Sequence, residues 1–283
     1  MATASARLSR TRGSLTTSTG AHRLRRPSLV LKRALAVGLI LGAWELLTGG
    51  FGGLLQPAVN PALLPPLSTA LVELQVYALS GLLLSDLAMT LGAALVGLLL
   101  GMLGGCAAGM LLGFWRAAGE VLEPVVVGLN SLPRVALAPV LVIWFGLGLT
   151  SKIVVGLLAV FFIVFFNTYM GVRSVDRQLV DAVRVMGATR IQTIRIVIFP
   201  AVLQWVFAAL RTSVSFGLTA VVVGEFVGAT GGLGYRMALA SGVLNTARVF
   251  AILLLLALVG TLVVEGAKHI EQRLLRWQPR GEP

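Results

Sequence analysis

Residues 172–200 read VRSVDRQLVDAVRVMGATRIQTIRIVIFP and lie between two long apolar segments of the chain. A connection of this length is unusual in a compact helical bundle, and its pattern predicts a helix. Asp176 is suited to cap the N-terminus of that helix, and Gly187 is suited to end it. Between these two residues, apolar side chains recur at helical spacing: Leu179, Val180, Val183 and Met186. We therefore expect an amphipathic helix outside the apolar segments.

A second short helix is predicted from Thr189 to about Ile198. It is expected to stop at Pro200, because proline lacks the amide hydrogen that continues a helix. Gly187 would form a hinge between the two helices. Two amphipathic helices joined in this way, set between apolar segments, are typical of a surface that docks on another protein.

The composition predicts a polytopic membrane protein. Of its 283 residues, 57% are hydrophobic and only 12% are charged, and the mean hydropathy is +0.92. A soluble domain carries roughly 25% charged residues, so this chain cannot cover a water-exposed surface. Its single cysteine, Cys106, excludes an intrachain disulfide, and both histidines, His22 and His269, lie outside the apolar segments.

Six apolar segments are each long enough to cross a bilayer core of about 30 Å. The predicted spans are Ala34–Leu55, Asp86–Phe114, Pro124–Leu147, Ile153–Gly171, Ala201–Gly224 and Val249–Ala267. The connections and termini on one side of these spans hold 18 lysines and arginines, and those on the other side hold 3. Because positive residues stay in the cytoplasm during insertion, both termini and residues 172–200 are predicted to be cytoplasmic.

This pattern divides the chain into three parts. Residues 1–33 contain eight lysines and arginines and no acid, which predicts a disordered, basic cytoplasmic tail. An organelle transit peptide is the alternative for this segment. Residues 34–279 form the predicted transmembrane domain, and residues 280–283 form a short C-terminal tail.

The stretch Asp181-Ala-Val-Arg-Val-Met-Gly187, followed by Val197-Ile-Phe-Pro200, resembles the signature loop of the membrane subunits of ATP-binding-cassette importers. The spacing matches throughout, and the departures from the family pattern conserve charge or apolarity: Asp181, Val183, Val197 and Phe199. In that family the loop is a coupling helix that sits in a cleft of the ATPase subunit. The resemblance assigns ATPase coupling to six residues here: Asp181, Ala182, Val183, Gly187, Ala188 and Pro200.

Four further stretches resemble the nitrate/sulfonate/taurine branch of these permeases: residues 132–148, 167–176, 224–235 and 274–279. The resemblance covers about residues 34–279 and implies an all-α, six-transmembrane-helix type I importer permease with a cytoplasmic coupling helix. It implies a multi-pass protein of the bacterial inner (plasma) membrane that carries no cofactor and is not an enzyme. By the same resemblance, a second permease copy would complete the membrane part as a homodimer, and no nucleic acid is involved.

The same resemblance implies three kinds of partner beside the lipid bilayer. Two copies of an ABC ATP-binding subunit would bind the ATP and Mg²⁺ and hydrolyse the ATP. An extracytoplasmic solute-binding protein, periplasmic or lipid-anchored, would deliver the solute. The solute is expected to be small and to be an anion such as an aliphatic sulfonate, taurine or nitrate.

The second span carries a glycine at every fourth residue, at positions 97, 101, 105, 109 and 113. Small residues at this spacing let two helix backbones approach closely. The stripe predicts a close helix crossing, with a flexible gate as the alternative.

A polar stripe on the fifth span is the candidate translocation path. Gln204, Arg211 and Ser215 fall on one helix face, and Arg211 lies eleven residues after Pro200, about 16 Å along a helix. That position is near the bilayer middle, where a charge is expected to face a cavity or a partner. Arg211 is therefore expected either to attract an anion in the path or to pair with Glu45 or helix-end carbonyls.

Two further features have open interpretations. Arg134, beside Pro133 in the third span, is expected either to reach the membrane interface or to face the inner end of the path. Glu225 and the glycine-rich run that follows, with Gly232 and Gly234, are the candidate outer gate. A plain re-entrant connection is the alternative for that run.

Two other classes of protein fit the sequence less well. A secondary transporter driven by an ion gradient needs acids near the bilayer midplane, but the acids in or beside the spans lie near span ends: Glu45, Asp86, Glu225 and Glu265. An intramembrane enzyme is disfavoured because no span holds a histidine. The importer permease is the leading hypothesis, and the secondary transporter is its alternative.

Overall fold

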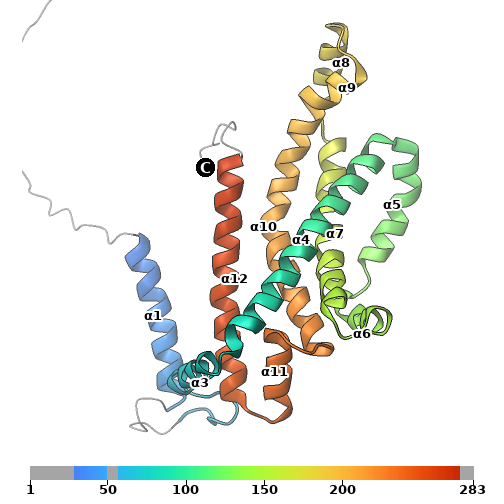
Figure 1. Ribbon diagram of the computed structural model, residues 1–283. Helices are drawn as coiled ribbons and strands as arrows, with labels where there is room; N and C mark the ends of the chain where they lie inside the picture. Colours follow the sequence, from blue (N-terminus) through green and yellow to red (C-terminus); the bar gives the residue numbers. More distant parts are fainter. Residues whose placement is uncertain (1–28, 50–56, 275–283) are drawn as a thin grey trace, which may run out of the picture. The chain divides into compact units, whose positions relative to one another are not determined.

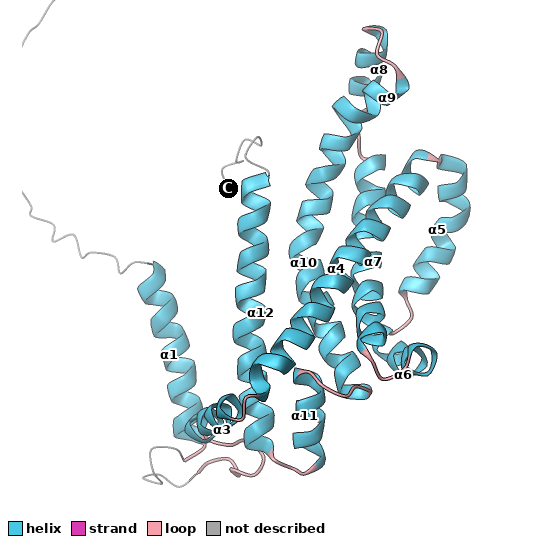
Figure 2. Ribbon diagram, viewed as in Figure 1, coloured by secondary structure: helices cyan, strands magenta, loops and turns pink. Residues whose placement is uncertain are grey.

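The computed structural model describes residues 29–49 and 57–274, and within these ranges the regular structure is helical (Figures 1 and 2). The helices are α1 (Leu29–Leu47), α3 (Leu67–Leu79), α4 (Leu82–Phe114), α5 (Arg116–Asn130), α6 (Arg134–Phe145), α7 (Leu149–Arg173), α8 (Arg177–Val185), α9 (Arg190–Thr193), the π-helical turn η1 (Ile194–Ile198), α10 (Phe199–Val227), α11 (Leu233–Gly242) and α12 (Thr246–Leu274). The expected all-α fold is confirmed.

The chain divides into two units, Met1–Ala43 and Trp44–Pro283. In the first unit the described residues belong to α1, whose side chains between Leu35 and Ile40 are exposed and largely apolar. The basic tail up to residue 28, the end of the predicted first span and residues 275–283 lie outside the described residues.

Four helices of the second unit are long and apolar enough to cross a membrane. They are Leu82–Phe114, Leu149–Arg173, Arg190–Val227 and Thr246–Arg273. These helices contain the predicted second, fourth, fifth and sixth spans and extend them by several residues.

The predicted third span, Pro124–Leu147, is wrong as one continuous helix. The chain leaves α5 at Asn130 and re-enters a helix, α6, only at Arg134. Pro133 has no amide hydrogen, and proline also disfavours helical dihedrals in the residue before it. The chain therefore breaks at Pro133, whereas Pro124 and Pro139 lie inside helices.

The glycine stripe of α4 packs directly on α7, as the sequence predicts. A Cβ atom added at Gly101 would lie 2.7 Å from the Val160 Cβ, and one added at Gly105 would lie 2.6 Å from the Phe161 carbonyl oxygen. Real Cβ atoms do not approach other atoms so closely, so only glycine allows this contact. The helix-crossing interpretation of the stripe is confirmed.

We expect Gly105→Ala to destabilise the fold by about 1–3 kcal/mol, because the added methyl group meets backbone that cannot move aside. Gly92→Ala, on the same helix, is the matched control because a Cβ there meets nothing within 4 Å. Thermal unfolding of both variants in detergent measures the difference. Equal melting temperatures would show that the α4–α7 contact is looser than described.

The α11 end of the second unit has its own apolar core. Tyr77 of α3, Leu233 of α11 and Ile252 of α12 are fully buried there, with Leu255 and Val259 beside them. This core fixes α3 and α11 against α12, and it thereby holds the loop between α10 and α11 beside the first turns of α4 and α7.

Candidate functional site

The amphipathic helix predicted after Asp176 is present as α8, with both of its predicted ends. Asp176 precedes the helix, and its carboxylate accepts a hydrogen bond from the Gln178 amide at 2.8 Å. Gly187 adopts a φ of +86°, a left-handed conformation that glycine reaches without strain. The Gly187 amide donates to the Arg184 carbonyl at 2.9 Å, and the Ala188 amide donates to the Val183 carbonyl at 3.2 Å.

The α8–α9 tip carries apolar side chains that no described part of the chain covers. No residue of α8 is buried, and Val185, Met186 and Ile191 are 89%, 85% and 77% exposed. Figure 1 shows α8 and α9 at the far end of α10, beyond the end of α7. Asp181 pairs only weakly with Arg184, at 4.0 Å and in solvent.

The second predicted helix does not stop at Pro200. The short helix α9 begins with a capping box, in which the Thr189 hydroxyl accepts from the Gln192 amide and the Gln192 side chain accepts from the Thr189 amide. The chain then passes through η1 into α10 without a break. Pro200 lies in the first turn of α10, where a local π-turn accommodates the missing amide hydrogen.

The polar stripe of α10 borders an open cavity. Arg211, Ser215 and Thr219 are all exposed on this helix, whereas Gln204 is half-buried. A cavity of about 570 Å³ lies between α10, α11 and α12, and its lining includes Ser215 and Thr219 but neither Gln204 nor Arg211. Apolar side chains form most of the remaining wall, together with Thr261 and Glu265 of α12.

Arg211 pairs with Glu271 of α12, and the predicted pairing with Glu45 is wrong. The Arg211 guanidinium lies 3.1 Å from the Glu271 carboxylate, and the arginine side chain is about half exposed. Glu45 instead accepts a hydrogen bond from the Ser68 amide at 3.1 Å.

The expected depth of Arg211 needs a correction too. The apolar part of α12 ends at Val264, and Glu271 lies in the polar segment that follows. Arg211 is therefore level with this polar segment and not with the middle of the apolar part. The expected depth was counted from Pro200, whereas the continuous helical segment that contains Pro200 begins at Arg190.

A second cavity, of about 290 Å³, opens at the break between α5 and α6. Leu132 and Pro133 from the break line it, together with Asn130, two residues of α7 and four residues of α10 that include Thr219. Thr219 therefore borders both cavities. Arg134 is the first residue of α6, and its side chain lies outside the part of the chain that the structure describes.

At the opposite end of the second unit, Glu225 of α10 is fully buried and forms an ion pair with Lys152 of α7 at 3.2 Å. The Lys152 ammonium also donates to the Gly231 carbonyl. The other Glu225 oxygen accepts from the Thr90 hydroxyl at 2.8 Å and from the Gly234 amide at 3.0 Å. These contacts fasten the loop after α10 to both α4 and α7.

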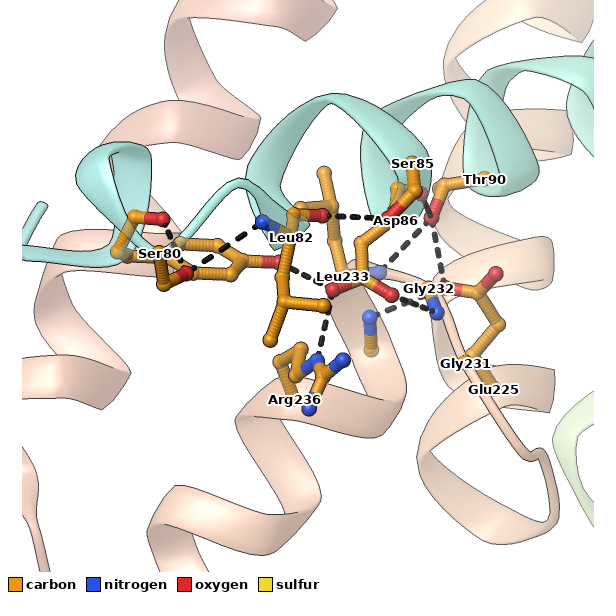
Figure 3. A network of polar contacts seen from close by, with 12 residues as sticks. Ser80, Leu82, Ser85, Asp86, Thr90, Glu225, Gly231, Gly232, Leu233 and Arg236 are labelled. Carbon is orange, nitrogen blue, oxygen red and sulfur yellow. Dashed lines mark hydrogen bonds and ion pairs between the residues drawn. The ribbon is translucent and has the colours of Figure 1, made fainter.

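Asp86 of α4 holds the same loop from a second point (Figure 3). Its carboxylate accepts from the Gly232 amide at 2.8 Å and from the Arg236 Nε at 2.7 Å. The Tyr77 hydroxyl of α3 also donates to it, at 2.8 Å. The hydrogen bond to Asp86 raises the pKa of the Arg236 guanidinium, so this arginine stays charged.

Glycine is required at two positions of this loop. Gly232 has a φ of +107°, and a Cβ atom there would overlap the Glu225 carboxylate. A Cβ atom at Gly234 would overlap the Val222 carbonyl oxygen. The predicted gate residues Glu225, Gly232 and Gly234 are thus neighbours in one buried polar network, which we call the Asp86–Glu225 network.

The other members of the network were not predicted as site residues: Tyr77, Asp86, Thr90, Lys152 and Arg236. In the sequence, Asp86 stands out only as an acid near a span end, and Lys152 and Arg236 count only among the charges between the spans. A usable signal was present, because two acids and two bases at the same end of otherwise apolar segments are expected to pair when buried.

Comparison with known proteins agrees with this architecture. Residues 97–276 match the model of the family described as "Binding-protein-dependent transport system inner membrane component". A chain of Bacillus subtilis (strain 168), named as an aliphatic sulfonates transport permease protein, is 32% identical over 248 residues, which is 88% of each chain. The riboflavin transport system permease protein of Chloroflexus aurantiacus (strain ATCC 29366 / DSM 635 / J-10-fl) is 37% identical over 70% of this chain and 74% of its own length.

The taurine transport system permease protein of Escherichia coli (strain K12) is 31% identical over 77% of this chain and 82% of its own length. Among solved structures, an inward-facing form of the MetNI methionine ABC transporter has a TM-score of 0.58 at 23% identity, covering 68% of this chain and 95% of that chain. An amino acid ABC transporter solved with histidines has a TM-score of 0.56 at 19% identity, covering 72% and 98%. These structures show a shared fold.

Proposed function

The chain belongs to the binding-protein-dependent transport inner membrane components, which are the permease subunits of ABC importers, in the sulfonate/taurine family, and from this premise we propose how it works. It forms the translocation path for a small solute and couples that path to ATP hydrolysis on a separate subunit. Membership of the family implies ATP-binding subunits and a solute-binding protein as partners. The ATP and Mg²⁺ are bound on the ATPase, and this chain performs no bond chemistry.

The observation that carries the proposal is the uncovered apolar surface of the α8–α9 tip. Val185, Met186 and Ile191 are each more than three-quarters exposed, and an apolar surface of this kind at the end of a projecting helix marks a protein contact. We assign this contact to the ATPase subunit. The coupling residues are then Asp181, Ala182, Val183, Gly187, Ala188 and Pro200.

The exposed stripe of α10 is the proposed path. Ser215 borders the larger cavity and Thr219 borders both, and a second copy of the chain would close the open side of the stripe as a homodimer. In this proposal Arg211 and Arg134 supply positive charge along the path, and Gln204 adds an amide. The solute is then small and carries an anionic group, as aliphatic sulfonates, taurine and nitrate do.

The Asp86–Glu225 network is the proposed outer closure of the path. It ties the loop after α10 to three helices through buried charges. The proposal places this closure on the extracytoplasmic side of the bacterial inner membrane. Both termini and the α8–α9 tip would then be cytoplasmic, as the distribution of lysine and arginine supports.

The buried acids do not favour the ion-gradient alternative. Among the described residues, Glu45, Asp86 and Glu225 are buried, and each accepts hydrogen bonds from protein donors. The relatives named above are transport permeases of the same family.

The proposed path predicts that Thr219→Trp abolishes solute uptake while the complex still assembles. The indole would fill space in both cavities, because Thr219 borders both. We expect uptake to fall to the level measured without ATP. The measurement is uptake of radiolabelled taurine, methanesulfonate and nitrate, with riboflavin for comparison, into proteoliposomes that hold the complete importer.

The matched control is Leu258→Trp, which puts the same side chain at an exposed position of α12 outside both cavities. This variant should transport normally. Full uptake by Thr219→Trp would show that the path lies elsewhere. Uptake of riboflavin alone would contradict the anion assignment and leave the permease role intact.

A further inference from the structure

A polar cluster joins α5 to the end of α7, close to the α8–α9 tip. The Tyr169 hydroxyl of α7 donates to the Glu123 carboxylate of α5 at 2.9 Å. Arg173 of α7 lies 3.5 Å from the same carboxylate and 3.5 Å from that of Glu120. The Arg173 guanidinium also covers the Tyr169 ring at 5.2 Å from its centre and donates to its hydroxyl.

The rest of α5 is mostly exposed. Among its described side chains, only the position of Gly119 is buried, and several apolar ones such as Val121 and Val125 are exposed. A Cβ atom at Gly119 would lie 2.8 Å from the Leu112 carbonyl oxygen of α4 and 3.2 Å from the Tyr169 hydroxyl of α7. The hydrogen bonds and ion pairs described between α5 and α7 are those of the cluster itself.

Along the chain, the cluster lies directly before the α8–α9 tip. Arg173 is the last residue of α7, and Asp176, the cap of α8, follows three residues later. A displacement of α8 therefore reaches Arg173 through a very short length of chain.

Through α5, the cluster is also connected to the wall of the 290 Å³ cavity. Glu123 is followed by two further turns of α5, about 10 Å at 1.5 Å per residue, and the break at Leu132 and Pro133 comes directly after the helix. Both of these residues line the 290 Å³ cavity that Thr219 also borders. A rigid α5 held at Glu123 would carry a movement of α7 to this wall.

We propose that Glu123, Tyr169 and Arg173 are positioning residues that transmit movement of α8 through α5 to the cavity wall at Leu132 and Pro133. The inference rests on the proposed function, because it takes α8 to be moved by an ATPase subunit. None of the three residues touches solute or ATP in this account. Their role is to make the cavity respond to the ATPase.

The test measures how accessible the cavity wall is to a labelling reagent, and it does not depend on the identity of the solute. In a Cys106→Ser background, a Leu132→Cys substitution provides a single thiol at the wall. The complex with its ATPase subunits is purified, and the rate of maleimide labelling is measured with and without ATP. The intact cluster should give a change of about tenfold in that rate, the scale at which residue networks modulate coupling.

Glu123→Gln and Tyr169→Phe should reduce this ATP response to less than about twofold, with ATP hydrolysis and the melting temperature nearly unchanged. Exchange of the two charges, Glu123→Arg with Arg173→Glu, should restore part of the response that either change alone removes. Glu73→Gln on α3 removes a carboxylate at the α11 end of the second unit and serves as the matched control.

An unchanged ATP response in Glu123→Gln and Tyr169→Phe would overturn the proposal. So would a loss of response seen only in variants whose melting temperature falls, because the cluster would then be merely structural. A failure of the proposed function looks different, since the unsubstituted protein would then purify without an ATPase or show no response to ATP.

Discussion

Glu225→Gln is expected to destabilise the permease by about 3–5 kcal/mol, the usual cost of removing one partner from a buried ion pair. Glutamine keeps the size of the side chain and can still accept from Thr90 and Gly234. What it removes is the charge opposite the Lys152 ammonium, whose side chain is only 4% exposed. The lysine would then have to be buried without that charge, or the loop after α10 would have to open.

The measurement is thermal or denaturant unfolding of the purified protein in detergent. Glu265→Gln is the matched control, because the ion pair of Glu265 with Lys268 is exposed and its loss should cost less than about 1 kcal/mol. Replacing both buried partners, as Lys152→Met with Glu225→Met, should recover part of the loss since no unpaired charge remains. Equal stability of Glu225→Gln and the unsubstituted protein would contradict the described pair.

Val185→Asp combined with Met186→Asp is expected to detach the permease from its ATPase. Burying one large apolar side chain contributes about 1.5–3 kcal/mol, so the loss of both weakens binding by about two orders of magnitude or more. Two carboxylates on the same surface would have to be desolvated in addition. ATP-dependent uptake should fall to background, and the ATPase should no longer co-purify.

The chain offers a close control for this double substitution. Val243 and Leu244, in the turn between α11 and α12, are 76% and 84% exposed, and this turn lies at the end of the unit opposite the α8–α9 tip (Figure 1). Changing both to aspartate alters charge and apolarity equally but should leave the ATPase attached. If both double variants retained the ATPase, the assignment of α8 as the coupling helix would be wrong.

Local signals gave the most reliable predictions. The capping residue Asp176, the apolar spacing after it and Gly187 predicted α8 with its correct ends, because all three act within a few residues of each other. The glycine stripe of α4 predicted a close helix crossing for the same reason, since a four-residue period defines one helix face. The partner helix, α7, could not be identified from that stripe alone.

The predictions that were wrong concern features that depend on distant parts of the chain. Whether a proline kinks a helix, breaks it or is absorbed by a π-turn depends on the groups available to replace the lost hydrogen bond. Pro133 breaks the predicted third span, whereas Pro200 is absorbed near the start of α10. The expected depth of Arg211 was counted from a helix end at Pro200 that the structure does not have.

The Asp86–Glu225 network shows a different limit. Its members come from five helices and one loop, and contacts such as that of Thr90 with Glu225 join residues 135 positions apart. Pairing over such separations is a property of the packed helices, so the sequence could indicate only that the buried charges need partners.

Purification of the chain from its native membrane in mild detergent, followed by mass spectrometry of the proteins that accompany it, tests the central claim most directly. The account predicts that an ATP-binding subunit accompanies the unsubstituted chain and is absent when Val185 and Met186 are changed to aspartate. If the chain instead purifies alone and still transports solute, then coupling through α8 is contradicted.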